Sequence, residues 1–254
     1  MLVSVLASGS EGNSTYVETE DAKILIDAGM NTKYLKTKLS ELEVDTKEID
    51  YVIMTHTHHD HTGALKTFLK RNPAKLVATE NMLKELEDIK DYENIIINPD
   101  SLEIGKTTVK PFKTSHDAID SRGYLIEDKT SSLVYMTDTG YLNQKYFEML
   151  SNKNIYIMEA NHDVEMLING SYPKWLKSRI LSDHGHLSNN AAGFYLSKLI
   201  GPNTKKVILA HLSKENNTED EAVRTVKKTL KEYEIDFEDI IVAKQRDKTE
   251  GIKA

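Results

Sequence analysis

The first half of the chain alternates short apolar runs with polar turns. Stretches of this kind are LVSVLA (2–7), TYVET (15–19), KILIDAG (23–29) and DYVIMTH (50–56). Their length and apolar content predict strands, and the polar cluster SGSEGN (8–13) predicts a turn. Helical spacing at 32–42 and 63–69 places a helix after two of these strands. The first half is therefore expected to alternate strands with helices.

The second half repeats this alternation. Short strands are expected between 94 and 127, beginning with NIIIN (94–98), and buried strands are expected at 131–140, 154–161 and 205–213. Helical spacing is found at 174–181, 188–199 and 219–234. Two groups of strands, each with its own helices, predict an α/β layered fold. We expect one domain over residues 1–254, built from two similar halves at about 1–127 and 128–254.

Composition narrows the class of protein. Hydrophobic residues make up 39% and charged residues 29% of the 254 positions, as in soluble globular proteins. The net charge of -7 disfavours a protein that covers nucleic acid through a basic face, although a nuclease can draw positive charge from metal ions. The absence of cysteine excludes disulfides and thiolate chemistry and fits the cytoplasm, where we expect the protein. Neither a signal peptide nor a membrane span is indicated.

The nine histidines are clustered rather than scattered. They lie in five places: His56, His58, His59 and His61 around Asp60, then His116, His162, the pair His184 and His186, and His211. Several of these places follow an apolar strand, and ligands of α/β sheets gather beyond the carboxyl ends of strands. One such histidine alone is more often an ordinary polar residue. Five protonatable groups within six residues would repel or desolvate one another unless a divalent cation binds them.

The spacing of the cluster indicates two metal ions. His56 and His58 lie two positions apart, so an extended backbone points both side chains the same way. Asp60 and His61 lie past the strand, where a turn can aim them at a second ion, whereas His59 is expected to face away.

Further ligands are expected downstream. His116 and His211 are the natural additions, and Asp138 ends a strand where its carboxylate can bridge two ions. Paired ions lower the pKa of water towards about 7, so that a hydroxide held between them attacks phosphorus.

The motif His56-x-His58-x-Asp60-His61, followed in order by His116, Asp138 and His211, resembles the signature of the metallo-β-lactamase fold hydrolases. The resemblance implies an αβ/βα sandwich, with two β-sheets flanked by helices. It also implies that His56, His58 and His116 hold one ion, that Asp60, His61 and His211 hold the other, and that Asp138 bridges them. Asp27, which ends the strand before the signature, would support the histidine loop from behind the ligands.

Longer segments are similar to one branch of this family, the YycJ/WalJ branch, along nearly the whole chain. They include SVLASGSEGNSTYVET, EANHDVEML and YPKWLKSRILSDHGHLSN. This branch is regarded as a group of metal-dependent exonucleases related to RNase Z-type phosphodiesterases. The resemblance therefore implies hydrolysis of DNA phosphodiesters with two divalent ions per chain, zinc or manganese. The corresponding phrase of the branch usually carries one histidine, so His184 is an addition without an assigned role.

Three residues are expected to act in catalysis beyond holding metal. Asp60 would orient the attacking water or accept its proton, and His186 would protonate the leaving oxygen or stabilise charge on the phosphate. Glu159 would hold His186 in one tautomer. The alternative for Glu159 is a surface carboxylate at a strand end.

Substrate contacts are expected in the turn between residues 8 and 14, whose N–H groups can face phosphate. Ser8, Ser10 and Asn13 are the candidates, and an ordinary hairpin turn is the alternative. His162 is either a further contact or a residue packed beside the site. The basic runs Lys33–Lys38 and Lys174–Arg179 either follow a nucleic-acid backbone or form solvated faces. Trp175 either stacks on a base or belongs to the core.

Four functions remain open at this point. A nuclease acting on DNA leads, and a phosphodiesterase of cyclic nucleotides or other small phosphodiesters is the main alternative, favoured by the acidic net charge. Glu159 and the segment around His186 argue against a lactonase or thioester hydrolase. A regulatory module that binds metal without turnover is the reading from a different class. The sequence is also compatible with a homodimer.

Overall fold

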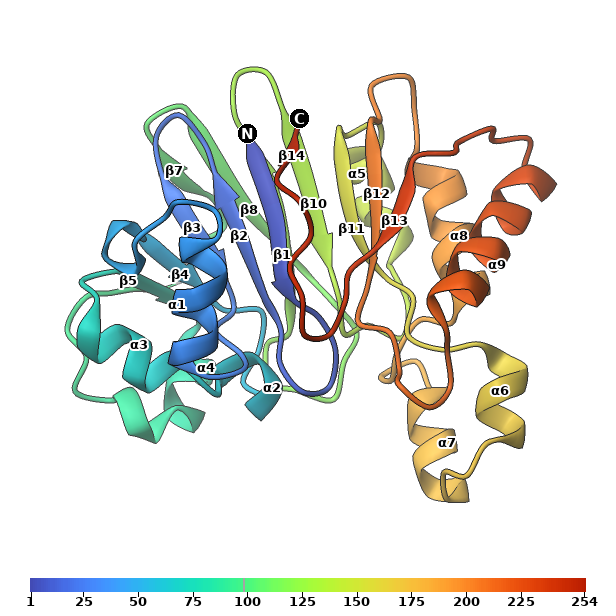
Figure 1. Ribbon diagram of the computed structural model, residues 1–254, viewed down its shortest axis with the longest axis horizontal. Coiled ribbons are helices and arrows are strands. Elements are labelled where there is room, and N and C mark those ends of the chain that lie inside the picture. Colours follow the sequence, from blue (N-terminus) through green and yellow to red (C-terminus); the bar gives the residue numbers. More distant parts are fainter. Residues whose placement is uncertain (98) are drawn as a thin grey trace.

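Two seven-stranded β-sheets pack face to face in the computed structural model, which describes residues 1–97 and 99–254 (Figure 1). The first sheet has the order β14 (Ile252–Lys253), β1 (Leu2–Ala7), β2 (Ser14–Glu18), β3 (Lys23–Ile26), β4 (Tyr51–Ile53), β5 (Lys75–Ala78) and β6 (Ile95–Ile97). The second has the order β13 (Ile240–Val242), β12 (Lys206–Ala210), β11 (Ile155–Glu159), β10 (Ser132–Met136), β9 (Arg122–Glu127), β8 (Thr107–Lys113) and β7 (Leu102–Ile104).

Each sheet combines a parallel and an antiparallel part. Strands β3 to β6 run parallel in the first sheet, as do β10 to β13 in the second, and the remaining neighbours are antiparallel. The chain passes from the first sheet to the second between β6 and β7, so residues 102–127 belong with the second sheet. This division lies earlier than the boundary expected near 127. Asn98, the last position of the strand expected at 94–98, lies outside the described residues.

Helices cover the outer face of each sheet (Figure 1). The first sheet is covered by α1 (Thr32–Ser40), α3 (Leu65–Arg71) and α4 (Glu80–Glu85), and the second by α5 (Phe147–Leu150), α8 (Asn189–Leu199) and α9 (Glu219–Glu232). The remaining helical elements are α2 (His59–Thr62), α6 (Val164–Asn169), α7 (Lys174–Ile180) and the 3-10 turns at Thr46–Glu48, Glu87–Ile89 and Gln144–Tyr146. The predicted αβ/βα sandwich of two sheets flanked by helices is confirmed.

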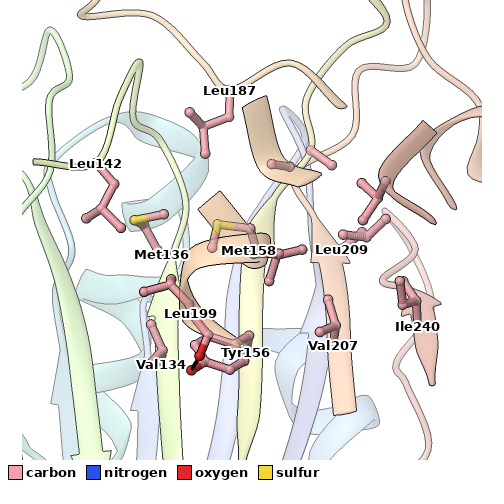
Figure 2. Packing of buried hydrophobic residues seen from close by; sticks show 14 of the residues in the cluster. Val134, Met136, Leu142, Tyr156, Met158, Leu187, Leu199, Val207, Leu209 and Ile240 are labelled. Carbon is pink, nitrogen blue, oxygen red and sulfur yellow. Dashed lines mark hydrogen bonds between the residues drawn. The ribbon is translucent and has the colours of Figure 1, made fainter. Parts of the chain in front are cut away.

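The central strands are buried on both faces, and their side chains alternate between two cores. In β11, Ile155 and Ile157 lie between the sheets, whereas Tyr156 and Met158 pack against the helices. Figure 2 shows this outer core, in which Tyr156 and Met158 lie near Leu199. The Tyr156 hydroxyl donates 2.8 Å hydrogen bonds to the carbonyl oxygens of Leu150 and Leu199, which satisfies its buried polar end.

Two further features concern the arrangement of the chain. The N- and C-termini meet because β14 pairs with β1, and α6 and α7 project away from the sheets at the lower right of Figure 1. Among the described residues, no helix combines the length and apolar character that crossing a membrane requires.

Candidate metal centre

The predicted site residues lie just beyond the carboxyl ends of strands. Asp27 follows β3, Asp138 lies two residues after β10, Glu159 is the last residue of β11, and His211 follows β12. Three of them adopt left-handed backbone conformations, with φ of 60° at Asp27, 55° at Asp138 and 58° at His211. Such conformations cost roughly 1–3 kcal/mol outside glycine and cluster at functional sites. The strands therefore end in abrupt turns that place these side chains at one edge of the sandwich.

The first group of predicted ligands comprises His56, His58 and His116, whose ring nitrogens lie within 4.8 Å of one another. The Nδ1–H of His116 donates to the carbonyl oxygen of Gly185 at 3.2 Å. This bond leaves Nε2 of His116 facing Nδ1 of His58, 3.3 Å away. A neutral imidazole with one nitrogen tied to a carbonyl presents the other as a metal ligand.

The second group comprises Asp60, His61 and His211, and one ligand atom of each residue lies within 4.8 Å of those of the other two. Nδ1 of His61 is held by Asp27 at 2.7 Å, so its Nε2 lies 3.5 Å from the nearer Asp60 oxygen. Nδ1 of His211 is held by Glu159 at 2.9 Å, and its Nε2 lies 3.7 Å from the same Asp60 oxygen. Both rings thus direct Nε2 towards Asp60.

Asp138 lies between the two groups. One carboxylate oxygen is 3.3 Å from Nε2 of His61, and the other is 3.9 Å from Nε2 of His116. The residue is 2% exposed. Asp138 therefore faces both groups of predicted ligands.

The donor set fits divalent cations. His56 Nε2, His211 Nε2 and one oxygen of Asp138 are buried and make no hydrogen bond to any described residue. A buried polar atom left in this state costs about 1–3 kcal/mol, and a cation would satisfy all three. Burial lowers the pKa of His56 well below its usual value, helped by the neighbouring His61, and burial also lowers the pKa of His116. A lowered pKa favours the neutral ring that a metal ligand requires.

Asp27 supports the histidine loop, as its predicted role requires. It is fully buried and accepts hydrogen bonds from Thr55 N (2.8 Å), Thr55 Oγ (2.7 Å) and His61 Nδ1 (2.7 Å). Carboxylate–histidine pairs of this kind fix the ring orientation and tautomer of a metal ligand.

Glu159 is a buried carboxylate that accepts four hydrogen bonds, and it is not a surface carboxylate. Its Oε1 accepts from Nδ1 of both His186 (2.8 Å) and His211 (2.9 Å), and its Oε2 accepts from the backbone N–H groups of Thr139 (3.1 Å) and Leu187 (3.0 Å). Burial opposes its charge, but the His186 and His211 rings more than offset this and lower the pKa of Glu159 to about 2. The geometry agrees with the predicted orienting role towards His186.

The expected substrate contacts differ in exposure. Ser8 is 2% exposed, and its hydroxyl accepts from the backbone N–H of His211 at 2.7 Å. Asn13 is 1% exposed and donates to the Asp60 carboxylate at 3.0 Å. Both side chains hold the site together and leave no free surface for a substrate, whereas Ser10 is exposed beside His186 and His211.

The turn between β1 and β2 is a hairpin turn that uses its own N–H groups. Ser8 N–H donates to Lys244 O, and Gly9 N–H donates to Asn13 Oδ1. Gly12 N–H donates to Gly9 O, and Asn13 N–H donates to Asp60 O. These four groups are not available to phosphate, and the expectation that the turn presents N–H groups to phosphate stays a prediction for the rest of the turn. The turn also packs against the backbone of Asp60.

The remaining histidines take different places. His162 is 1% exposed, its ring makes no hydrogen bond to any described residue, and burial lowers its pKa to about 4. This burial argues for packing beside the site and against substrate contact. His59 is exposed on α2, as expected of a residue that faces away, and His184 is exposed with its Nδ1 3.2 Å from Ser115 Oγ.

Asp117 is a neighbour of the site that the sequence analysis does not single out. One of its oxygens lies 3.4 Å from Nε2 of His116, and its carboxylate pairs with Arg179 at the end of α7. Its place directly after His116 was the available signal. Trp175, also on α7, is 68% exposed and is not a core residue.

Comparison with known proteins agrees with this geometry. Residues 22–212 match the family described as the β-lactamase superfamily domain. The chain is 37% identical over 239 residues to exodeoxyribonuclease WalJ of Streptococcus pneumoniae serotype 2, covering 91% of this chain and 89% of that protein. It is 35% identical over 234 residues to exodeoxyribonuclease YycJ of Bacillus anthracis, covering 90% and 89%.

The fold is shared with a solved structure at lower identity. The metallo-β-lactamase fold protein YhfI from Bacillus subtilis superposes with a TM-score of 0.74 at 19% identity, covering 98% of this chain and 99% of that one. The family match, the relatives and the buried His/Asp clusters together identify a divalent-metal site. The chain belongs to the metallo-β-lactamase superfamily, in the group that contains WalJ and YycJ.

Proposed function

We propose that this protein is a metal-dependent phosphodiesterase that acts as a DNA exonuclease. The observation that carries the proposal is the position of Asp138, a buried carboxylate that faces both His/Asp groups at 3.3–3.9 Å. Two ions held this way suit in-line displacement at phosphorus. The curated relatives named exodeoxyribonuclease support DNA as the substrate.

The residues present would hold two divalent ions. His56, His58 and His116 would bind one, Asp60, His61 and His211 would bind the other, and Asp138 would contact both. When bound, the ions neutralise charge on the phosphate and lower the pKa of water, which makes it a nucleophile near neutral pH. Zinc and manganese are the ions we propose, since imidazole and carboxylate ligands serve both.

The protein's own groups would then manage protons and orientation. Asp60, held by the Asn13 amide at 3.0 Å, would orient the attacking water or accept its proton. His186 would donate a proton from Nε2 to the leaving oxygen, because its Nδ1–H is bonded to Glu159 at 2.8 Å. The Glu159 carboxylate stabilises the charged ring before this transfer. A positioned acid contributes about 10²- to 10⁴-fold to the rate.

Two further expectations belong to this proposal. We propose the cytoplasm as the compartment, in keeping with the absence of cysteine. A homodimer stays a prediction, which light scattering of the purified protein would test.

A competitive assay tests the function directly. Manganese-loaded protein would be given end-labelled duplex DNA and cyclic mononucleotides together, with Asp60→Ala as the inactive variant. Asp88→Ala is the matched control, because Asp88 is a surface carboxylate that pairs with Lys66. Release of mononucleotides from DNA by the wild type and the control, but not by Asp60→Ala, is expected. Opening of the cyclic nucleotides with DNA untouched would replace the exonuclease with a small-molecule phosphodiesterase.

A further inference from the structure

An arginine from the projecting α6–α7 arm, Arg179, pairs with a carboxylate beside the metal centre. The guanidinium of Arg179 makes two hydrogen bonds to the Asp117 carboxylate, from Nε at 2.5 Å and from the terminal nitrogen at 3.0 Å. The same carboxylate lies 3.4 Å from Nε2 of His116 and 3.9 Å from Nε2 of His58. The Asp117 carboxylate therefore contacts both the Arg179 guanidinium and the first group of ligands.

Arg179 also lines a small cavity next to His186 and His211. The cavity has a volume of about 150 Å³, and its walls include Ser10, Tyr172, His186 and His211. Arg179 is its one lysine or arginine among the described residues. Arg179 therefore lies beside the proposed proton donor, whose ring is 5.1 Å from that of His116. The nearby Asp138 and Asp60 help to keep the pKa of Arg179 high, after the larger effect of Asp117.

We propose that Arg179 binds the phosphate of the substrate strand, and that Asp117 occupies the guanidinium when no substrate is present. The inference rests on the proposed function, and it adds a residue that positions the substrate. A carboxylate and a phosphate both present two oxygens to the arginine fork, so one can replace the other. Asp117 therefore stands in for the phosphate.

The exposure of the pair makes this exchange inexpensive. The Arg179 side chain is 42% exposed and that of Asp117 is 35% exposed. Ion pairs of this exposure contribute little to stability, so a substrate phosphate can displace the carboxylate. Once displaced, Asp117 would move away from the metal centre. Its negative charge would then no longer oppose binding of the phosphate there.

A purely structural link between α7 and the loop after β8 makes a different prediction. If the pair only fixes the arm, then removing either partner should harm the enzyme in the same way. If Asp117 competes with substrate, the two changes should act in opposite directions. Arg179→Gln should raise the KM for DNA about 10- to 100-fold, as expected for loss of a charge-assisted contact, and Asp117→Asn should lower it.

The experiment uses the metal-loaded, full-length protein and two readouts. One is KM and kcat on an end-labelled oligonucleotide, and the other is binding of a fluorescent, hydrolysis-resistant phosphorothioate oligonucleotide by anisotropy. Arg224→Gln is the matched control, because Arg224 also pairs with a carboxylate, Glu221, but lies on α9 away from the centre. Metal content per chain is measured for every variant, since Asp117 adjoins His116.

Weaker binding by Arg179→Gln together with tighter binding by Asp117→Asn, at unchanged metal content, would support the proposal. Equal weakening by both variants, or an unchanged Kd for Arg179→Gln, would overturn it. Failure of the proposed function appears elsewhere, as a wild-type protein that releases no nucleotide from DNA. The anisotropy arm needs no turnover, so it still decides the role of Arg179 in that case, and absence of binding by the wild type would also overturn the proposal.

Discussion

Replacing Glu159 with glutamine keeps the shape of a fully buried side chain but removes an acceptor that four donors share. In the metal-free protein the amide can turn its oxygen to the two backbone N–H groups and donate to the rings of His186 and His211, whose protons move to Nε2. With metal on His211 Nε2, the proton of that ring must stay on Nδ1 and then faces the amide N–H. One buried donor loses its acceptor, at about 1–3 kcal/mol.

Metal affinity of Glu159→Gln should therefore fall about 5- to 150-fold. The metal-free protein should also lose about 1–3 kcal/mol of stability, because charge-assisted hydrogen bonds to His186 and His211 become neutral ones. Competition with a chromophoric chelator measures the affinity, and urea unfolding followed by circular dichroism measures the stability. Glu221→Gln is the control, since Glu221 lies on the surface of α9 and bonds to Arg224. An unchanged metal affinity, or a metal-free protein of unchanged stability, would refute the reasoning.

Three further changes test other parts of the structure. Removal of metal by a chelator should lower the Tm by roughly 8–16 °C in calorimetry, because saturation at about 1,000 Kd contributes about 4 kcal/mol; no fall would contradict a buried centre. A Cβ at Gly29 would lie 2.0 Å from the Asp60 carbonyl oxygen, so Gly29→Ala should weaken metal binding roughly tenfold or more by chelator competition. Gly251→Ala, which meets only the Leu2 side chain, should not. Met158→Ala should cost about 2–5 kcal/mol in urea unfolding and leave metal content unchanged, because Met158 is buried in the outer core.

Local pattern was enough to predict most of the strands and the order of the ligand groups. Apolar runs such as those of β4 and β11 end at polar residues, and this feature alone located His56 and Glu159 at strand ends. The helix expected at 219–234 is found at Glu219–Glu232, because Thr218 caps it and its apolar residues recur at helical spacing. The boundary between the halves was harder to predict, because β7 to β9 pair with one another and with β10 in the second sheet, and pairing is not a local property.

Side-chain roles that depend on burial could not be predicted. Asn13 was expected to meet substrate, yet the hairpin turn packs on the Asp60 backbone and encloses it. The pair of Asp117 and Arg179 joins positions 62 residues apart. No spacing rule signals such a contact. The left-handed φ at Asp138 was equally hidden, because aspartate is tolerated there but is far from diagnostic of it.

Each sheet contributes a buried carboxylate that orients a histidine of the centre. Asp27, which follows β3, and Glu159, which ends β11 and also holds His186, are buried carboxylates that hold Nδ1 of His61 and His211 respectively. Both histidines then direct Nε2 towards Asp60. The second group of ligands therefore needs both sheets in register, and the apolar layer between them sets the distance. Packing between the sheets is for this reason part of the metal site.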